Sequence, residues 1–302
     1  MEATELALSS GKEAPTYRLL ARRGARRWLG LLPFLGFALA FMILPCATIL
    51  VGSFQDAEGH FTLANFAHLA RPSIMSAYLV TIEVSAASAL GGTLLGFLLA
   101  YAITLGRLPK ELRSMLLTFC GVASNFAGVP LAFAFIATLG RMGMVTFVLK
   151  NVFGLNLYEM GFNLYSFWGL CLTYLYFQLP LMVLIITPAL DGVRREWREA
   201  SESLGASKYQ YWRQVALPIL MPSLLSSAIL LFGNAFGAYA TAYALTGGLL
   251  NLVPILIGAQ IQGDVLHDPN LGYALALGMV VVMGLSILAY RTLQKRSSRW
   301  LA

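Results

Sequence analysis

Charged residues are scarce in this chain. Lys and Arg number 21 and Asp and Glu 14 among 302 residues, or 12%, whereas about a quarter of an average soluble chain is charged. Apolar residues make up 58%, and the mean hydropathy is +0.71. Because a soluble domain needs charge to cover its surface, this composition excludes an ordinary soluble enzyme, a secreted disulfide scaffold and a disordered chain. Lipid is the expected solvent for most of the chain.

Cysteine and histidine are also rare, with three of each. The cysteines lie in different apolar stretches without the spacing of a pair, so we expect buried structural thiols at Cys46, Cys120 and Cys171. The histidines fall in expected loops and lack metal-ligand or catalytic spacing: His60, His68 and His267. Neither a Gly-x-Ser-x-Gly elbow nor a P-loop is present. We therefore expect no catalytic residues, cofactor or metal site, and no ATP binding through a P-loop.

Long uncharged intervals dominate what the sequence does contain. They run over 28–55, 84–106, 114–140, 160–190, 214–263 and 269–290. A transmembrane helix needs about 20 residues, so every interval is long enough. These intervals predict an all-α membrane protein with six transmembrane helices, at about 29–53, 79–105, 115–139, 164–190, 218–245 and 271–290.

Two of these intervals allow a second interpretation. The 214–263 interval is long enough for two spans, but its second half holds glycine breaks, Pro254 and three amide side chains. We therefore expect one span followed by an external loop with a short apolar turn. The first interval follows a basic start, as in a signal peptide, but it exceeds an h-region of about 7–15 residues and no A-x-A site follows it. It is expected to remain as a membrane anchor.

The basic residues are distributed unevenly about the predicted spans. With the N-terminus inside, 18 of the 21 fall in inner segments, and the outer segments hold only Arg71, Arg141 and Lys150. Since short cytoplasmic loops are enriched in Lys and Arg, both termini are predicted to be cytoplasmic. The transmembrane domain is expected at 28–293, with cytoplasmic tails at 1–27 and 294–302. The net charge of +7 follows from this topology, and no nucleic-acid partner is expected.

The densest mixed cluster of charge lies in the longest inner loop, residues 191–217. Two short helices are predicted there, at 194–204 and 207–215. Gly205 suits the left-handed position that ends a helix, and Ser207 with Gln210 forms a capping box that starts the next one. An apolar side is expected from Trp197, Leu204, Tyr209, Trp212 and Val215. A loop with this much structure is predicted to dock onto a partner.

This loop resembles the EAA loop of binding-protein-dependent ABC importer permeases. The family pattern is Glu-Ala-Ala, three residues, Gly, nine residues, Ile, one residue and Leu-Pro. The same spacing is present here in Glu199, Ala200, Ser201, Gly205, Val215, Leu217 and Pro218. Serine at the third position and valine in place of isoleucine are mild departures, and the six-span pattern extends the resemblance over about residues 25–300.

The resemblance implies a type I importer permease in a bacterial inner membrane. It implies that the loop sits in a cleft of a cytoplasmic ABC ATPase dimer, which hydrolyses ATP and moves the transmembrane helices. Glu199 would make a charged contact with the ATPase, and Gly205, followed by Ala206, would permit the turn. The small residues Ala200 and Ser201 would allow close approach. The residues alone leave open an amphipathic helix that lies on anionic lipid headgroups.

The resemblance also implies a second permease subunit, identical or homologous, and an extracytoplasmic substrate-binding protein. The segments 232–248, 272–275 and 299–301 look like permeases grouped with spermidine/putrescine systems, so a polyamine is the expected substrate. Ferric iron and an aminophosphonate remain alternatives. An ion-coupled secondary transporter is a more distant one, because such proteins usually carry several intramembrane charges.

Polar residues inside the spans are costly and usually face a cavity or a partner helix. Six polar or aromatic residues are predicted to border the translocation path: Glu83, Asn125, Gln178, Asn234, Tyr239 and Tyr243. Glu83 is the only charge inside a span, and snorkelling to the headgroups is its alternative role. Helix packing is the alternative for the small-residue stretch around Asn234. Pro130 with Gly128, and Pro180, are expected to mark irregular helix segments.

Overall fold

The computed structural model describes residues 31–106, 108–263 and 267–298. The predicted tail at 1–27 lies outside these residues, as do residues 299–302 of the predicted C-terminal tail. The described part is helical and contains no strand beyond one isolated bridge between Gln55 and Phe61, which confirms the all-α class. The chain forms two units, residues 1–52 and residues 53–302.

The first unit contains one apolar helical stretch, Leu32–Ser53, which ends at the boundary with the second unit. It comprises α2 (Leu32–Ala38), a π-helical segment (Leu39–Ile43) and α3 (Leu44–Ser53). Cys46 on α3 is exposed, so its expected burial is wrong. The reason is that this stretch is apolar on every side, and such a helix has no single face that packing must cover.

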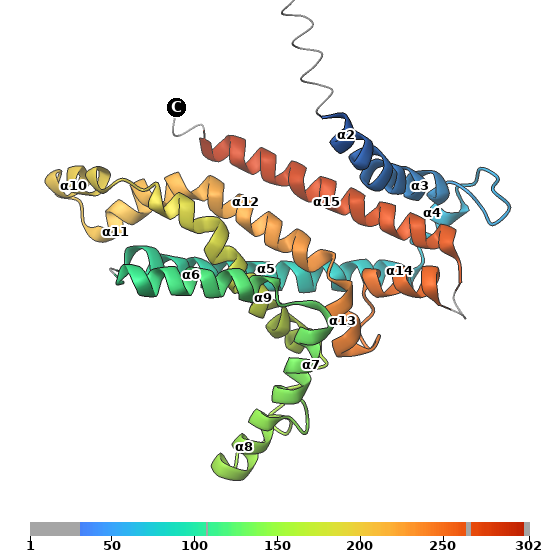
Figure 1. Cartoon of the computed structure of the whole chain (residues 1–302), viewed down its shortest axis with the longest axis horizontal. Coiled ribbons are helices and arrows are strands. Elements are labelled where there is room, and N and C mark those ends of the chain that lie inside the picture. The colour runs from blue at the N-terminus through green and yellow to red at the C-terminus, as the bar shows by residue number, and fades with distance from the viewer. Residues whose placement is uncertain (1–30, 107, 264–266, 299–302) are drawn as a thin grey trace, which may run out of the picture. The chain divides into compact units, whose positions relative to one another are not determined.

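Four long helices form the framework of the second unit (Figure 1): α5 (Pro72–Leu105), α9 (Phe167–Asp191), α12 (Leu217–Phe236) and α15 (Pro269–Ser298). Helix α5 packs along both α9 and α12, and α12 also contacts α15. Pro72 begins α5 at a position where a missing backbone N–H costs nothing, because the first helical N–H groups have no partner within the helix.

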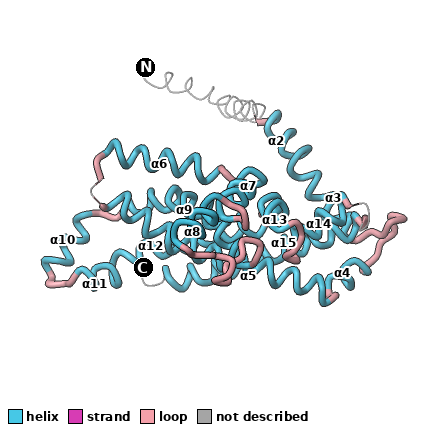
Figure 2. The backbone as a smooth tube through the Cα atoms, turned by 90° about the horizontal axis from the view of Figure 1, so that it is seen from below, coloured by secondary structure: helices cyan, strands magenta, loops and turns pink. Residues whose placement is uncertain are grey.

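The shorter helices of this unit are α4 (Ala64–Leu69), α6 (Lys110–Asn125), α7 (Gly128–Leu139), α8 (Met144–Phe153), α10 (Arg195–Ser203), α11 (Lys208–Tyr211), α13 (Tyr239–Thr246) and α14 (Val253–Gln262). A π-helical segment, Trp212–Ala216, joins α11 to α12. Helices α10 and α11 lie at one end of α5, and α4 lies at its other end (Figure 1), an arrangement that is also visible from below (Figure 2). At about 1.5 Å per residue, the 34 residues of α5 separate these ends by about 50 Å.

Six stretches of the described chain are long and apolar enough to cross a membrane, which confirms the expected number of spans. The third differs in detail from the expected 115–139. That segment is divided into α6 and α7, and the apolar stretch is instead Gly128–Phe153, over α7 and α8. Gly128, with φ of +73°, follows the end of α6 at Asn125 and begins α7, as expected for an irregular segment here.

The expected fifth span, 218–245, is also divided, because α12 ends at Phe236 and α13 begins at Tyr239. The short apolar turn expected after it is instead the ten-residue helix α14. Buried Val253, Pro254 and Ile255 begin α14, and packing against α15 stabilises it. The prediction of an irregular segment at Pro180 is wrong, since α9 continues through this residue. Neighbouring helices in a bundle compensate for the hydrogen bond that proline cannot donate.

The end of the bundle nearest α10 has its own hydrophobic core. Buried side chains from α5, α6, α9 and α12 form it: Ala89, Ala100, Ile103, Cys120, Met182, Val183, Ile186, Leu190, Leu220 and Leu231. Leu108, Val193 and Trp212 pack against this core, which we name the loop-end core. It supports both ends of the 191–217 loop, where α9 leaves the bundle and α12 returns to it.

Candidate functional site

Helix α10 is the most isolated part of the 191–217 loop. None of its residues is buried. It is stabilised locally by two ion pairs along its own surface, Arg195 to Glu199 at 3.0 Å and Arg198 to Glu202 at 2.8 Å. The hydrogen bond to Glu202 raises the pKa of Arg198 above its usual value, so this guanidinium stays charged. Local contacts therefore form α10, and its surface is left free.

Gly205 ends α10 in a left-handed turn, as the sequence predicts. Its φ is +80°, and an added Cβ would meet no atom within 4 Å. The N–H of Gly205 donates to the carbonyl of Glu202, and the N–H of Ala206 donates to that of Ser201, both at 3.0 Å. These two bonds form a Schellman motif, which satisfies carbonyls that the helix leaves without partners. The turn therefore has one defined geometry.

The capping box after the turn is also confirmed. The backbone N–H of Ser207 donates to Oε1 of Gln210 at 2.7 Å, and the N–H of Gln210 donates to Oγ of Ser207 at 3.3 Å. The helix that begins here does not end near residue 215, as predicted. It continues through the π-helical segment into α12, as one apolar stretch over Lys208–Phe236. The turn at Gly205 is therefore connected directly to a transmembrane helix.

The expected apolar side of the loop is divided between its tip and its base. At the tip, Leu204 is 88% exposed and Tyr209 is 68% exposed. At the base, the Trp212 ring meets Tyr101 of α5 edge-on, with centroids 5.2 Å apart. Tyr211 is buried at 6% exposure, and sequence reasoning missed it. Its spacing of four from Val215, on the packed side of the helix, is the signal that would have found it.

The residues of the EAA-like pattern follow the same division. Glu199, Ala200 and Gly205 are exposed, and Ser201 and Ala206 are partly buried at the turn. Val215, Leu217 and Pro218 are partly buried where the helix enters the bundle. The first group is accessible to another protein, and the second fixes the direction in which the loop leaves the membrane domain.

The predicted path residues do not form one cluster in this chain. Tyr239 and Tyr243 stack on each other on α13, with ring centroids 5.5 Å apart, and both are exposed. Asn125 and Asn234 are exposed near the ends of α6 and α12, where the helices break. Glu83 is exposed on α5, on the helix face that also carries the exposed Leu79, Leu90 and Leu94.

Gln178 lies apart from these exposed residues. Its side chain is fully buried, and Nε2 donates to Oγ of Ser88 on α5 at 3.3 Å and to the carbonyl of Leu231 on α12 at 3.5 Å. It therefore joins α9 to both neighbours within the core. Such a side chain contributes to helix association in a membrane.

The two helix breaks are hydrogen-bonded across the bundle, which sequence reasoning missed. The N–H of Gly128, at the start of α7, donates to Oγ1 of Thr241 on α13 at 2.8 Å. The hydroxyl of Tyr174 donates to the freed carbonyl of Ala238 at 3.0 Å. The Phe126 ring also meets that of Tyr176, at 5.9 Å between centroids. Non-helical backbone inside a membrane requires such partners.

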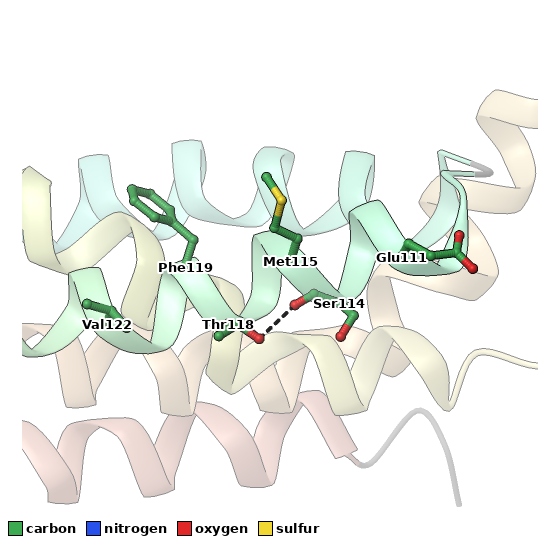
Figure 3. A pocket seen from close by; sticks show the side chains of 6 residues that line it. All are labelled: Glu111, Ser114, Met115, Thr118, Phe119 and Val122. Carbon is green, nitrogen blue, oxygen red and sulfur yellow. Dashed lines mark hydrogen bonds between the residues drawn. The ribbon is translucent and has the colours of Figure 1, made fainter.

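Two further features offer no defined site. An open groove runs along one face of α6 (Figure 3), lined by Glu111, Ser114, Met115, Thr118, Phe119 and Val122. All six residues belong to one helix, so no second element encloses a ligand there. Within the groove, Oγ1 of Thr118 donates to the carbonyl of Ser114 at 2.9 Å, as helix hydroxyls commonly do.

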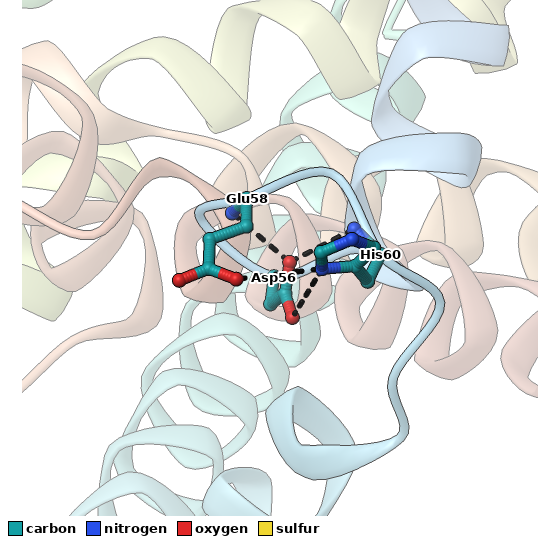
Figure 4. Close-up of side chains that lie close together, drawn as sticks. All are labelled: Asp56, Glu58 and His60. Atoms are coloured by element: carbon teal, nitrogen blue, oxygen red, sulfur yellow. Dashed lines mark hydrogen bonds and ion pairs between the residues drawn. The ribbon is translucent and has the colours of Figure 1, made fainter.

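The second feature is an exposed loop in which Asp56, Glu58 and His60 place possible metal-ligating atoms within 4.8 Å of one another (Figure 4). However, Oδ1 of Asp56 already accepts the backbone N–H groups of Glu58 and His60, at 3.0 and 2.9 Å. These hydrogen bonds close a turn, and exposed acidic groups in a turn need no ion.

Comparison with known proteins finds transport permeases among the relatives of this chain. The chain is 27% identical over 229 residues to the molybdenum transport system permease protein ModB of Mycobacterium tuberculosis, covering 74% of this chain and 81% of that protein. It is 25% identical over 273 residues to the spermidine/putrescine transport system permease protein PotB of Escherichia coli K12, covering 84% and 93%. The ion-coupled secondary transporter is set aside by these similarities.

A solved structure has the same fold. It is the crystal structure of a bacterial ABC transporter involved in the import of the acidic polysaccharide alginate, with a TM-score of 0.73 at 18% identity over 92% of this chain and 99% of that one. The family model described as "binding-protein-dependent transport system inner membrane component" matches residues 92–302, which include the whole 191–217 loop. The chain therefore belongs to this family, as a multi-pass inner-membrane permease subunit of an ABC importer.

Proposed function

We propose that the loop tip, residues 199–206, docks on a cytoplasmic ABC ATPase dimer and couples its ATP hydrolysis to transport. One observation carries the proposal: α10 has no buried residue, and yet a Schellman motif and a capping box hold its end in a defined turn. A side chain as apolar as that of Leu204 is costly to leave in water at 88% exposure. A partner that covers the tip removes this cost.

The position of α10 favours docking over the alternative of a helix lying on the headgroups. In Figure 1, α10 is carried at the end of the bundle by α11, which is itself an extension of α12. A displacement of the tip is thereby passed to α12 along one helix. The contact between Trp212 and Tyr101 passes it to α5 as well. These are the two helices that pack on either side of Gln178.

The translocation path is assigned to the exposed face near the two helix breaks, with a second permease subunit completing it. Asn125, Asn234, Tyr239 and Tyr243 supply amide and aromatic groups on this face. Glu83 stays in the proposal because a charge on an exposed transmembrane stripe requires a polar or protein environment. Gln178 is left out, since its burial between three helices keeps it from any path in this conformation.

A polyamine is the proposed substrate, delivered by an extracytoplasmic binding protein. Similarity to a spermidine/putrescine permease over 84% of the chain supports it. Stacked tyrosine rings and a carboxylate also suit an organic cation. Ferric iron and an aminophosphonate remain alternatives. The similarity to a molybdenum permease favours an oxyanion as the second candidate.

The test is uptake of labelled spermidine into proteoliposomes that contain the permease, its partner permease, the ATPase and the binding protein. Gly205→Asp is expected to abolish uptake while the protein still inserts, because Asp tolerates a left-handed backbone but adds charge at the tip. Gly154→Asp is the matched control, since Gly154 also ends a helix at positive φ and faces open space. Unchanged uptake in Gly205→Asp contradicts the docking role.

A further inference from the structure

One ion pair in the described part of the chain joins segments that are far apart in sequence. Nη2 of Arg113 donates to Oδ1 and Oδ2 of Asp191 at 2.8 and 2.7 Å. Arg113 lies in the first turn of α6, and Asp191 is the last residue of α9, 78 residues later. The other ion pairs described for this chain join residues at most four positions apart.

Each charge of this pair is badly placed on its own helix. The carboxylate of Asp191 stands at the C-terminal end of α9, where the helix dipole is negative, and Arg113 stands near the positive N-terminal end of α6. Between the two helices the arrangement is favourable. Asp191 lies beside the positive N-terminal end of α6, and Arg113 lies beside the negative C-terminal end of α9. The pair is therefore stabilised only while these two helix ends stay together.

The pair is also placed at the root of the 191–217 loop. Three residues after Asp191, Arg194 occupies the position directly before α10. Leu190 and Val193, on either side of Asp191, pack in the loop-end core. Leu108, which precedes α6, packs in the same core. Ionic and apolar contacts thus join the same two segments.

We propose that Arg113 and Asp191 form a brace that makes α6 move together with the root of the coupling loop. The proposal rests on the docking function above, because it concerns how movement of α10 reaches the path. Helix α6 ends at Asn125, directly before the break that bears Phe126. The brace thereby provides a second mechanical route from the ATPase to the path face, independent of the continuous helix through α12.

The test measures substrate uptake per ATP hydrolysed in the same proteoliposomes. Partly exposed ion pairs contribute modestly, so R113Q and D191N are each expected to lower this ratio roughly two- to five-fold. The double variant R113D/D191R keeps an ion pair and is expected to regain the ratio. R113K is expected to stay near wild type, because only one guanidinium nitrogen makes the contact. K110Q and E111Q are matched controls that change charge in the same helical turn.

The brace is overturned if both single variants keep the wild-type ratio, or if the charge exchange recovers nothing. If these variants keep a normal ratio of uptake to ATP hydrolysis while Gly205→Asp loses uptake, the brace is refuted and docking is not. Normal uptake in Gly205→Asp refutes docking itself. Where single variants do not insert, a short bifunctional thiol cross-linker joins R113C to D191C in a background without other cysteines. Retained transport after cross-linking supports the brace, and loss of transport overturns it.

Discussion

Replacing Gly96 by alanine is expected to destabilise the permease where α5 packs against α9. Gly96 lies on α5, and an added Cβ would stand 2.6 Å from Cβ of Met182, 2.8 Å from its Cγ and 3.1 Å from the carbonyl oxygen of Leu179 on α9. Neither Cβ of Met182 nor the backbone carbonyl moves without the helix. Since α9 has to shift, the overpacking cost is about 1–3 kcal/mol.

Gly121→Ala on α6 is the matched control with the opposite expectation. No atom lies within 4 Å of a Cβ at Gly121, and alanine is favoured over glycine inside a helix by about 0.5–1 kcal/mol. The measurement is the midpoint of thermal unfolding in detergent, where about 1 kcal/mol corresponds to about 2–4 °C in a chain of 150–250 residues. Gly96→Ala should lower it by roughly 2–12 °C, on the same scale. Gly121→Ala should leave it equal or slightly higher. Equal shifts of the midpoint for both variants contradict an overpacking cost at Gly96.

Three further predictions concern the loop and the path. Ser207→Ala removes the capping box and costs about 1 kcal/mol of local stability, measured as faster amide hydrogen exchange in α11; unchanged exchange argues against the cap. Trp212→Ala removes the contact with Tyr101, so uptake per ATP should fall while the ATPase still co-purifies; an unchanged ratio contradicts this route. Asn234→Leu should change uptake without changing assembly, and normal uptake removes Asn234 from the path.

Local chemistry made the turn of the 191–217 loop predictable. Gly205 and the Ser207–Gln210 box act over three or four residues, so the sequence contains all the information that their geometry needs. The six spans were predictable for a similar reason, because long uncharged intervals have one stable solution in lipid. Neither inference depends on how distant segments pack.

The continuity of α11 with α12 was not predictable in the same way. Pro218 is compatible with a helix start, which placed the expected boundary near residue 218. In the structure, a π-helical segment carries the helix through this point. The break after Phe236 was equally hidden, since Gly237 is also compatible with a helix. It becomes stable through Tyr174 on α9, whose hydroxyl donates to the freed carbonyl of Ala238.

Path residues were the hardest to predict, because a polar residue in a span has two possible environments. Gln178 and Asn234 look equivalent in sequence, but the first is buried between three helices and the second is exposed. Tertiary packing alone distinguishes them. The pair of Arg113 and Asp191 was hidden for the same reason, since 78 residues separate two charges that the folded helices bring together.

The most direct test of the docking claim is cross-linking of the loop tip to the ATPase. In a variant without native cysteines, Leu204→Cys presents a thiol at the exposed tip, and Leu63→Cys presents one on an exposed residue beside α4, at the other end of α5. With a thiol-reactive photocross-linker in assembled membranes, we expect Leu204→Cys to capture the ATPase and Leu63→Cys not to capture it. Capture through Leu63→Cys, or no capture through Leu204→Cys, contradicts docking of the ATPase at the loop tip.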